Sequence, residues 1–274
     1  MPTALRDLRG FMLDLDGVVY TGQQVIPGAR EFFAWLRQSS ARFLLITNNS
    51  SRGPEQFALR LGRMGIHVAP VEILTSAEAT GEFLVGNAPA ASRVFVIGEQ
   101  GLHSALEARG FQLVDDEDAA YVVVGLDRQF DYRKLTIAIR AVLNGAHFIG
   151  SNPDVTLPDA AGILPGAGSV QAAIRAATGV EPTIIGKPEP TMLSYGLRRL
   201  GCAPHEVAVI GDRLDTDIIG GRRAGLVTIL VLTGISSEDD LTRSSVQPDY
   251  VVRDLFALVR MLGPATAKRS ARAR

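Results

Sequence analysis

Short apolar runs alternate along this chain with longer segments whose apolar residues recur at helical spacing. Near the start, the runs at 11–13 and 43–46 predict buried strands, and the periodic segments at 29–38 and 54–64 predict helices. Strands and helices that alternate over short connections are typical of a parallel sheet covered by helices. The first part of the chain therefore predicts an α/β fold.

The same alternation starts again in the middle of the chain and once more toward its end. In the middle, it predicts strands at 93–97, 121–124 and 147–150 and helices at 101–109, 132–144 and 169–177. Toward the end, it predicts strands at 183–185, 207–210, 227–232 and 250–252. The middle segment has its own alternation and could hold a small core of its own.

Four of the predicted strands end in a reactive polar residue. These residues are Asp14, Thr47, Lys187 and Asp212. Ligands of an open parallel sheet bind outside the carboxyl ends of its strands, so we expect the four groups to gather at one edge. Each signal alone is weak, because an Asp-Gly pair is also an ordinary turn signal and a single lysine usually lies on the surface. The four together predict a site.

The residue types at these strand ends suit phosphoryl transfer. Asp14 and Asp16 stand two positions apart, and such close like charges are tolerable if a cation lies between them or one carboxyl keeps a proton. Carboxylate oxygens from separate strands suit Mg²⁺, which completes its shell with waters and substrate phosphate. Mg²⁺ and Lys187 would offset the repulsion between Asp14 and a phosphate dianion, with help from backbone amides near Asn48. This set fits phosphoryl transfer better than acyl transfer or redox chemistry.

The motifs DLDGV, TNNS, GKPEP and GDRLDTD, in this order, resemble the four motifs of the haloacid dehalogenase (HAD) superfamily. The insert between the second and third motifs, with its stretch GSNPDVTLPDAAGILPGAGS, is similar to the C2-type cap of the NagD-like, p-nitrophenyl phosphatase-like branch. The resemblance covers residues 10–262. It implies a doubly wound, Rossmann-like parallel-sheet core formed by 1–78 plus 182–264, with an inserted α/β cap domain at 79–181.

The resemblance also implies a role for each motif. Asp14 would be the nucleophile and form an aspartyl-phosphate, and Asp16 would be the general acid and then the general base. Dehalogenases of this fold lack the second acid, so the presence of Asp16 implies a phosphate ester as substrate. The residues implied in phosphate binding are Thr47, Asn48, Asn49 and Lys187, and Lys187 would also neutralise the nucleophile.

A Mg²⁺ site is implied at the same place. Asp14, Asp212 and the main-chain carbonyl of Asp16 would hold the ion, and Asp217 would lie behind them and order the waters of the metal. The histidines show no metal-ligand spacing, so no zinc site is expected.

The loop at 151–157 is the part of the inserted block that we expect to touch the substrate. If the block covers the open edge as a lid, Asn152 would contact the leaving group and help to select the ester, while the lid excludes water. The resemblance also implies dimerisation through this cap.

Composition and charge indicate which partners and which cellular compartment to expect. The net charge of −1 gives no general attraction to nucleic acid or anionic membrane, and the single Cys202 cannot form an internal disulfide, as expected for a reducing cytoplasm. The N-terminus has no apolar signal segment, and the longest strongly apolar run, 224–235, is about half of the ~20 residues that span a bilayer. The basic segment 265–274 is expected to be a disordered tail. We expect a cytoplasmic protein whose partner is a small phosphorylated metabolite.

The predicted function is a Mg²⁺-dependent phosphatase for small phosphate monoesters, such as sugar, nucleotide or glycerol-type phosphates. A phosphomutase or another phosphotransferase of the same fold fits the motifs as well. A non-catalytic receiver-like phospho-switch also combines acids, a Thr and a Lys at strand ends, but it is shorter, has no inserted block and does not need a proton donor at Asp16.

Overall fold

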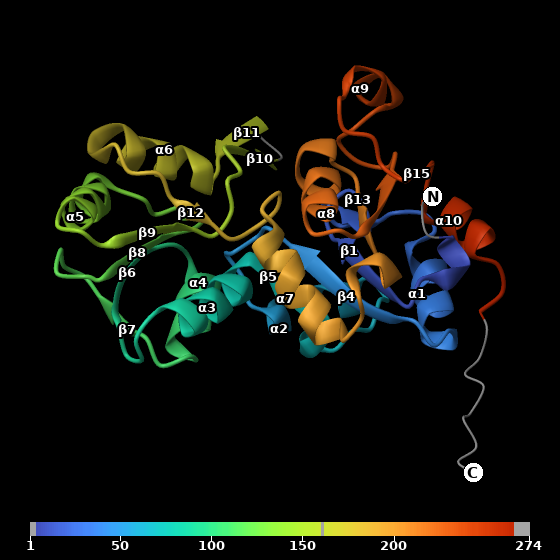
Figure 1. Ribbon diagram of the computed structural model, residues 1–274, viewed down its shortest axis with the longest axis horizontal. Helices are drawn as coiled ribbons and strands as arrows, with labels where there is room; N and C mark the ends of the chain where they lie inside the picture. The colour runs from blue at the N-terminus through green and yellow to red at the C-terminus, as the bar shows by residue number, and fades with distance from the viewer. Residues whose placement is uncertain (1–3, 160–161, 266–274) are drawn as a thin grey trace, which may run out of the picture. The chain divides into compact units, whose positions relative to one another are not determined.

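The computed structural model describes residues 4–159 and 162–265 (Figure 1). The chain forms two compact units, and each is described by itself. The first unit contains Met1–Ile46, Ala58–Ile73 and Gly196–Arg274, and the second unit contains Thr47–Phe57 and Leu74–Tyr195. All but the first residue of the predicted basic tail falls at 266–274, outside the described residues.

The first unit is built on a six-stranded sheet with the order β15-β14-β13-β1-β4-β5. Its strands are β1 (Gly10–Asp14), β4 (Arg42–Thr47), β5 (Ile73–Thr75), β13 (Val207–Gly211), β14 (Val227–Val231) and β15 (Tyr250–Val252). β1 pairs in parallel with β13 and β4, and the β13-β14 and β14-β15 pairs are parallel too. The last residues of β4 and β5 belong to the second unit by their contacts. The parallel α/β core predicted from the sequence is confirmed.

The central strands of this sheet are apolar on both faces. Phe11, Met12 and Leu13 of β1 are fully buried, and every residue of β13 is buried. A parallel strand with helices on both sides of its sheet has no solvent face, so its sequence is a continuous apolar run instead of an alternating one. This burial explains why β1 and β13 could be predicted from the sequence.

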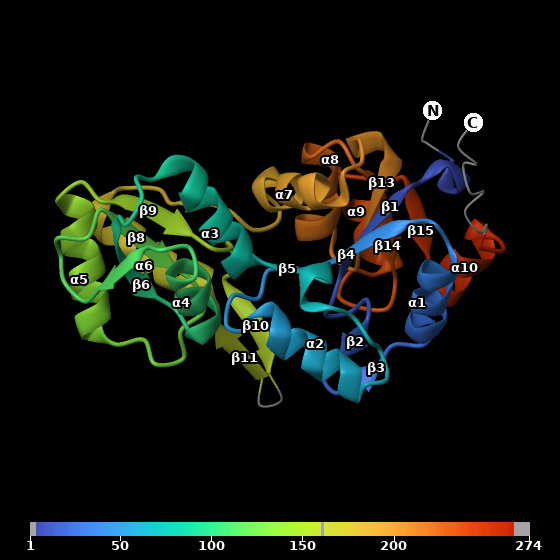
Figure 2. The ribbon, with the colours of Figure 1, turned by 90° about the horizontal axis from the view of Figure 1, so that it is seen from below.

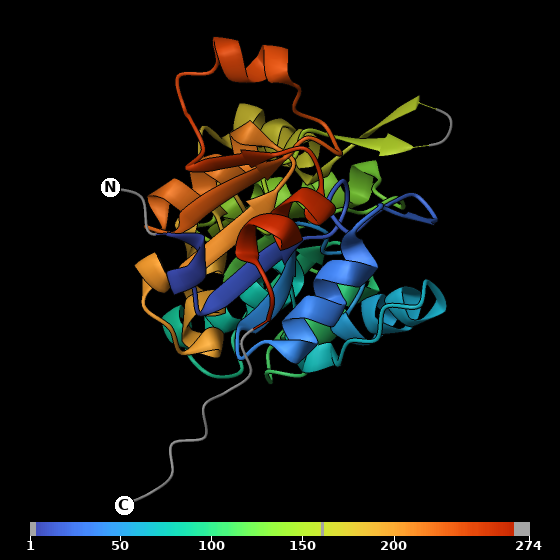
Figure 3. The ribbon, with the colours of Figure 1, turned by 90° about the vertical axis from the view of Figure 1, so that its right-hand side faces the viewer.

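Helix α1 (Ala29–Gln38) packs on the sheet through an apolar stripe that recurs every three or four residues. The ring of Phe32 lies edge-on to that of Phe11, with centroids 5.7 Å apart, and Trp35 stacks on Phe32 at 5.9 Å. The Trp35 Nε1–H donates to the carbonyl of Gly263 at 2.9 Å, just after α10 (Leu255–Leu262). This hydrogen bond holds the end of α10 beside α1 (Figure 3).

The other segments associated with the first unit are shorter or span both units. A hairpin follows β1, formed by β2 (Tyr20–Thr21) and β3 (Gln24–Val25). The helical segments are η1 (Leu5–Asp7), η2 (Pro70–Glu72), η3 (Pro204–Glu206), the π-helical turn η4 (Leu214–Ile218), α8 (Ile219–Arg223) and α9 (Glu238–Arg243). Helices α2 (Pro54–Arg63) and α7 (Pro190–Leu200) contain residues of both units.

The second unit has its own parallel sheet, with the order β12-β9-β8-β6-β7. Its strands are β6 (Arg93–Ile97), β7 (Gln112–Val114), β8 (Tyr121–Val124), β9 (His147–Gly150) and β12 (Thr183–Ile184). Its helices are α3 (Ser76–Asn87), α4 (Gln100–Glu107), α5 (Tyr132–Leu143) and α6 (Ala167–Thr178). Helices α5 and α6 cover one face of this sheet, and α3 and α4 lie on the other (Figure 1).

A separate apolar core lies under α5 and α6 of the second unit. It includes Phe95, Val122, Val124, Ala138 and Ile174, all buried. A core of its own was expected for the middle of the chain, and the structure has one. A further hairpin, β10 (Thr156–Asp159) and β11 (Gly162–Pro165), extends away from the sheet (Figure 2).

One strand lies in a sheet other than the one expected. The short run before Lys187 was assigned to the core sheet, but β12 pairs with β9, with Thr183 opposite Ile149 and Ile184 opposite Gly150. Two paired residues carry too little pattern to indicate which sheet they join. The boundaries drawn from the sequence at 79 and 181 stay a prediction. Of the helices in the described residues, none combines the length and the apolar character needed to cross a bilayer.

Candidate active site

Three carboxylates of the first unit meet at the carboxyl end of its central strands. Asp14 is the last residue of β1, Asp212 follows β13 directly, and Leu13 pairs with Ile210, so the two acids leave neighbouring strands at the same edge. One oxygen each of Asp14, Asp212 and Asp217 lies within 4.8 Å of the others. We call these three residues the acidic cluster. Asp14 is half-buried, and the other two are buried.

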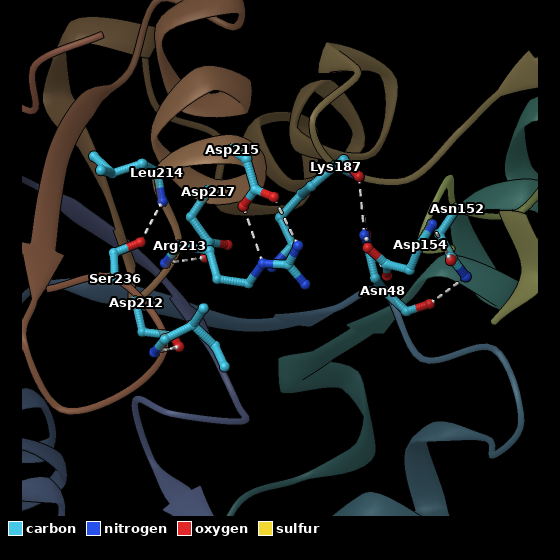
Figure 4. Close-up of polar contacts among 11 residues, drawn as sticks. Asn48, Asn152, Asp154, Lys187, Asp212, Arg213, Leu214, Asp215, Asp217 and Ser236 are labelled. Carbon is cyan, nitrogen blue, oxygen red and sulfur yellow. Dashed lines mark hydrogen bonds and ion pairs between the residues drawn. The ribbon is translucent and has the colours of Figure 1, made fainter. Parts of the chain in front are cut away.

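Asp212 is held by the loop that follows β14. The backbone N–H of Ile235 donates to Asp212 Oδ2 at 2.7 Å, and the N–H of Ser236 donates to the Asp212 carbonyl at 3.0 Å. The Ser236 hydroxyl accepts from the Leu214 N–H at 3.0 Å, as Figure 4 shows. The loop therefore fixes both the main chain and the carboxylate of Asp212. The segment TGISS at 233–237 carries no distinctive signal, so the role of this loop could not be predicted from the sequence.

Asp217 enters the acidic cluster through the π-helical turn η4. Its Oδ2 accepts from the Arg213 N–H at 3.2 Å, and its side chain is buried. Single π-helical turns are often found at functional sites, where they redirect a side chain. Asp215 of the same turn points elsewhere: its carboxylate pairs with the Arg213 guanidinium at 2.8 and 3.0 Å, which lowers the pKa of Asp215.

Three glycines pack directly against the acidic cluster. A Cβ at Gly17 or Gly234 would overlap the carboxylate of Asp212, and a Cβ at Gly211 would overlap the side chain of Asp217. Gly17 also has a φ of +79°, in the left-handed region that favours glycine. The close approach of backbone to carboxylate at these positions needs residues without a side chain.

Replacing Gly17 by alanine should reduce activity far more than it reduces stability. The left-handed backbone costs a side chain about 1–2 kcal/mol, and the added methyl group also displaces Asp212. Gly22→Ala is the matched control, because Gly22 has a φ of +57° and open space around its Cβ position among the described residues. Both variants should lose stability through the left-handed backbone, Gly17→Ala somewhat more because of the overlap with Asp212, and only Gly17→Ala should lose kcat/KM, by about 100-fold. Equal activity of the two variants would contradict this role.

Asp16 lies in the turn that follows β1. Its side chain is exposed, its backbone bridges to Tyr20, and the Gly17 N–H donates to the Tyr20 carbonyl at 2.9 Å. The turn thus places Asp16 two residues beyond Asp14 with its carboxyl group accessible to solvent. Its role as proton donor and the use of its carbonyl as a metal ligand stay predictions.

In the second unit, the side chain of Asn48 holds the backbone of Lys187. Asn48 Oδ1 accepts from the Lys187 N–H at 2.9 Å, and Asn48 Nδ2 donates to the Lys187 carbonyl at 2.9 Å. The same Nδ2 donates to Asp154 Oδ2 at 3.1 Å (Figure 4). Lys187 is only 2% exposed, so its cationic group lies in a poorly solvated place.

The polar run before α2 is largely bonded within itself. Thr47 Oγ1 accepts from the Asn49 N–H at 3.1 Å, and Asn49 Oδ1 accepts from the N–H and the hydroxyl of Ser51. These bonds fit the local capping that Ser, Thr and Asn commonly provide. The Asn49 side chain therefore has a structural use, and its predicted contact with phosphate stays a prediction.

Asn152 is buried in the second unit, and its expected contact with the leaving group stays a prediction. It is 4% exposed, and its Nδ2 donates to the Asn48 carbonyl at 2.8 Å. Its Oδ1 accepts from the Asp154 N–H at 3.1 Å. Both ends of the amide are therefore bonded to the protein.

The acidic cluster fits a hard divalent cation. Mg²⁺ prefers oxygen ligands and is usually held by a few carboxylates together with water and substrate phosphate. The predicted ligands were Asp14, Asp212 and the Asp16 carbonyl, with Asp217 behind them, whereas the Asp217 carboxylate lies in the cluster itself. Asp217 is thus a candidate ligand in its own right. The π-helical turn η4 brings Asp217 back to the acidic cluster, and the spacing of residues in the sequence could not indicate such a turn.

A cavity of about 490 Å³ lies elsewhere in the first unit, near Arg42 at the start of β4. The guanidinium of Arg37 pairs with Glu72 at 2.6 and 2.8 Å, and Arg42 donates to the carbonyl of Leu200 at the end of α7. These arginines bind a carboxylate and carbonyl groups at the end of a helix. We assign no catalytic role to this cavity.

Comparison with known proteins identifies the class. Residues 11–112 match the family described as haloacid dehalogenase-like hydrolase, and residues 184–258 match the HAD-hydrolase-like family. An acid sugar phosphatase of Staphylococcus saprophyticus is 41% identical over 94% of this chain and 99% of its own length. One of Staphylococcus aureus is 42% identical over 92% of this chain and 96% of its own. The chain belongs to the haloacid dehalogenase superfamily of hydrolases, and it is a phosphoric monoester hydrolase.

Solved structures place the chain in one branch of that superfamily. The 4-nitrophenylphosphatase of Thermotoga maritima has a TM-score of 0.90 and 35% identity, covering 94% of this chain and 99% of that one. The glycerol phosphate phosphatase of Mycobacterium tuberculosis, in complex with magnesium, has a TM-score of 0.86 and 33% identity over 97% of this chain and 79% of that one. The chain is a member of the NagD-like, p-nitrophenyl phosphatase branch, as its motifs indicated. These relatives are phosphatases, which favours hydrolysis over the phosphomutase and phospho-switch alternatives.

Proposed function

We propose that this protein is a Mg²⁺-dependent phosphatase that hydrolyses small sugar phosphates through an aspartyl-phosphate on Asp14. The observation that carries the proposal is the acidic cluster, in which Asp14 ends a central strand within 4.8 Å of Asp212 and Asp217. The acid sugar phosphatases of Staphylococcus, similar over nearly their whole length, support sugar phosphates as the substrate class.

Asp14, Asp212 and Asp217 are the residues that would hold Mg²⁺. When bound, the ion supplies positive charge that offsets the repulsion between a carboxylate and a phosphate dianion. The glycines that pack against Asp212 and Asp217 keep these carboxylates in fixed positions, so little reorganisation is needed when charge develops.

The first displacement transfers the phosphoryl group to Asp14. A carboxylate oxygen of Asp14 attacks phosphorus, and the bond between phosphorus and the ester oxygen breaks with its electron pair on that oxygen. The carboxyl group of Asp16 gives its proton to the leaving oxygen, which departs as an alcohol. The products of this step are the alcohol, the aspartyl-phosphate and the Asp16 carboxylate.

The second displacement returns the enzyme to its starting state. The Asp16 carboxylate accepts a proton from water as the water oxygen attacks phosphorus. The bond between phosphorus and the Asp14 oxygen breaks, which restores the Asp14 carboxylate and releases inorganic phosphate. Because Asp16 is exposed in its turn, it can exchange protons with solvent between cycles.

Thr47, the Asn48 backbone N–H and Lys187 are proposed to bind the phosphate oxygens. A lysine that is 2% exposed interacts with a phosphate more strongly than a solvated one, because water screens the charge less. We further propose a cytoplasmic location, a small phosphorylated metabolite as partner, and a homodimer formed through the inserted block.

A panel of phosphate esters tests the substrate class. Purified protein with Mg²⁺ should release inorganic phosphate steadily from p-nitrophenyl phosphate, and sugar phosphates should give the highest kcat/KM among sugar, glycerol and nucleoside monophosphates. A preference for glycerol phosphate or nucleotides would contradict the sugar class while leaving the phosphatase mechanism in place. Transfer of the phosphoryl group to a second hydroxyl, in place of its release, would contradict hydrolysis.

A further inference from the structure

Both the oxygen and the nitrogen of the Asn48 side-chain amide make hydrogen bonds to other residues of the second unit. Its oxygen accepts from the Lys187 N–H, and its nitrogen donates to the Lys187 carbonyl and to Asp154 Oδ2. The orientation of this amide is fixed by its partners, because an N–H needs an acceptor and a carbonyl needs a donor. Asn48 thus determines the position of the Lys187 main chain on both sides of its Cα.

Asn48 is in turn fixed by hydrogen bonds that other residues donate to its main-chain carbonyl. Its carbonyl accepts from Asn152 Nδ2 at 2.8 Å and from the Ser76 hydroxyl at 2.6 Å. The carbonyl of Asn152 accepts from the buried Gln171 amide at 2.8 Å, which connects the loop to α6. Buried and partly buried hydrogen bonds of this kind support one another, because breaking one leaves a polar group without its partner in a poorly solvated place.

The packing around these residues leaves little room for Asn48 or the loop at 151–154 to take another position. A Cβ at Gly186 would lie 2.7 Å from both Asn48 Oδ1 and the Ser151 carbonyl, and a Cβ at Gly168 would overlap the Pro153 carbonyl. The chain therefore approaches Asn48 and the loop at 151–154 as closely as backbone allows. A shift of Asn48 would have to move the neighbouring main chain as well.

We infer that Asn152 is a positioning residue, which acts through Asn48 on Lys187 and does not contact the leaving group. The inference rests on the proposed function, in which Lys187 binds the phosphate group. It replaces the specificity role expected from the sequence with a role in holding the phosphate-binding lysine. Asn152 contributes equally to every ester, because all of them share the phosphate.

The two roles differ in a measurable way. A residue that contacts the leaving group changes the ranking of esters when it is replaced, and it leaves inhibition by inorganic phosphate unchanged. A residue that positions Lys187 lowers kcat/KM by the same factor for all esters, and it weakens competitive inhibition by inorganic phosphate, which has no leaving group. Inorganic phosphate is therefore the discriminating probe.

The experiment compares Asn152→Ala and Asn152→Asp with the wild-type protein. Asn152→Asp keeps the shape and the acceptor for the Asp154 N–H but sets an oxygen against the Asn48 carbonyl. Ser169→Ala is the matched control, because it removes a hydrogen bond to the Val155 carbonyl at 2.7 Å in the same loop without touching Asn48. Each variant is measured with three esters of different leaving groups, with inorganic phosphate as inhibitor, and by thermal unfolding.

Both Asn152 variants should lose kcat/KM by roughly 10- to 100-fold with the ranking of esters unchanged, and the Ki for inorganic phosphate should rise about tenfold. The isosteric Asn152→Asp should be at least as impaired as Asn152→Ala, and Ser169→Ala should resemble the wild type. A changed ranking with an unchanged Ki would overturn the inference, and so would full activity of Asn152→Asp. If a variant unfolds below the assay temperature, the ratio of kcat/KM values among esters, measured at lower temperature, still decides. If the wild type does not hydrolyse the esters, the proposed function fails, which is a different result from any change confined to the Asn152 variants.

Discussion

Asp14→Asn should abolish phosphate release, with a loss in kcat of about 10⁴-fold or more. The asparagine amide has nearly the same shape as the carboxylate but is neutral and a poor nucleophile. Asp14 ends the buried strand β1, so the substitution should not disturb the fold. It also removes one negative charge from the acidic cluster, and in the absence of metal the variant should unfold at the same temperature as the wild type or higher.

Asp7→Asn is the control for Asp14→Asn. Asp7 is exposed, and its carboxylate makes no polar contact within the described residues. This variant should keep full activity. Measured kcat values with p-nitrophenyl phosphate and a sugar phosphate, together with thermal unfolding curves, complete the comparison. Substantial turnover by a folded Asp14→Asn protein would rule out Asp14 as the nucleophile.

Asp212→Asn should raise the Mg²⁺ concentration needed for half-maximal activity by at least about 100-fold. The asparagine oxygen can still accept from the Ile235 N–H, so the loop after β14 can stay in place. The lost negative charge removes one of three carboxylates that would hold the cation. Chelation of Mg²⁺ should inactivate the wild type, and added Mg²⁺ should restore it.

Thermal unfolding gives a second readout for Asp212 that does not depend on turnover. Because a ligand that binds only the folded state stabilises it, Mg²⁺ should raise the Tm of the wild type and leave that of Asp212→Asn nearly unchanged. Asp215→Asn is the matched control, since Asp215 pairs with Arg213 outside the acidic cluster. An Mg²⁺-dependent Tm shift that survives in Asp212→Asn would contradict the proposed metal site.

The core strands and the acids at their ends could be predicted because both signals are local and strong. β1 and β13 are continuous apolar runs, as strands buried on both faces must be, and Asp14 and Asp212 follow them directly. Parallel pairing then brings the two acids to one edge without any further information.

Other features of the two units depend on contacts that the spacing of residues in the sequence does not reveal. β12 is two residues long, and only its pairing with β9 assigns the segment before Lys187 to the second sheet. Asp217 reaches the acidic cluster through a π-helical turn, and the loop that holds Asp212 comes from beyond β14. The positioning role that we propose for Asn152 rests on its burial and on its bond to the Asn48 carbonyl, neither of which its sequence position could indicate.

The central claim is that Asp14 carries the phosphoryl group, and Asp16→Asn offers the most direct test of it. p-Nitrophenolate leaves without a proton, so the first displacement needs no general acid, whereas the attack of water still needs the base that this variant lacks. Rapid mixing of Asp16→Asn with p-nitrophenyl phosphate and Mg²⁺ should give a burst of p-nitrophenolate that equals the active-site concentration, followed by slow turnover. The phosphoryl group should then be found on the peptide that contains Asp14. A linear time course with no burst, or a phosphoryl group on any other residue, would contradict the account.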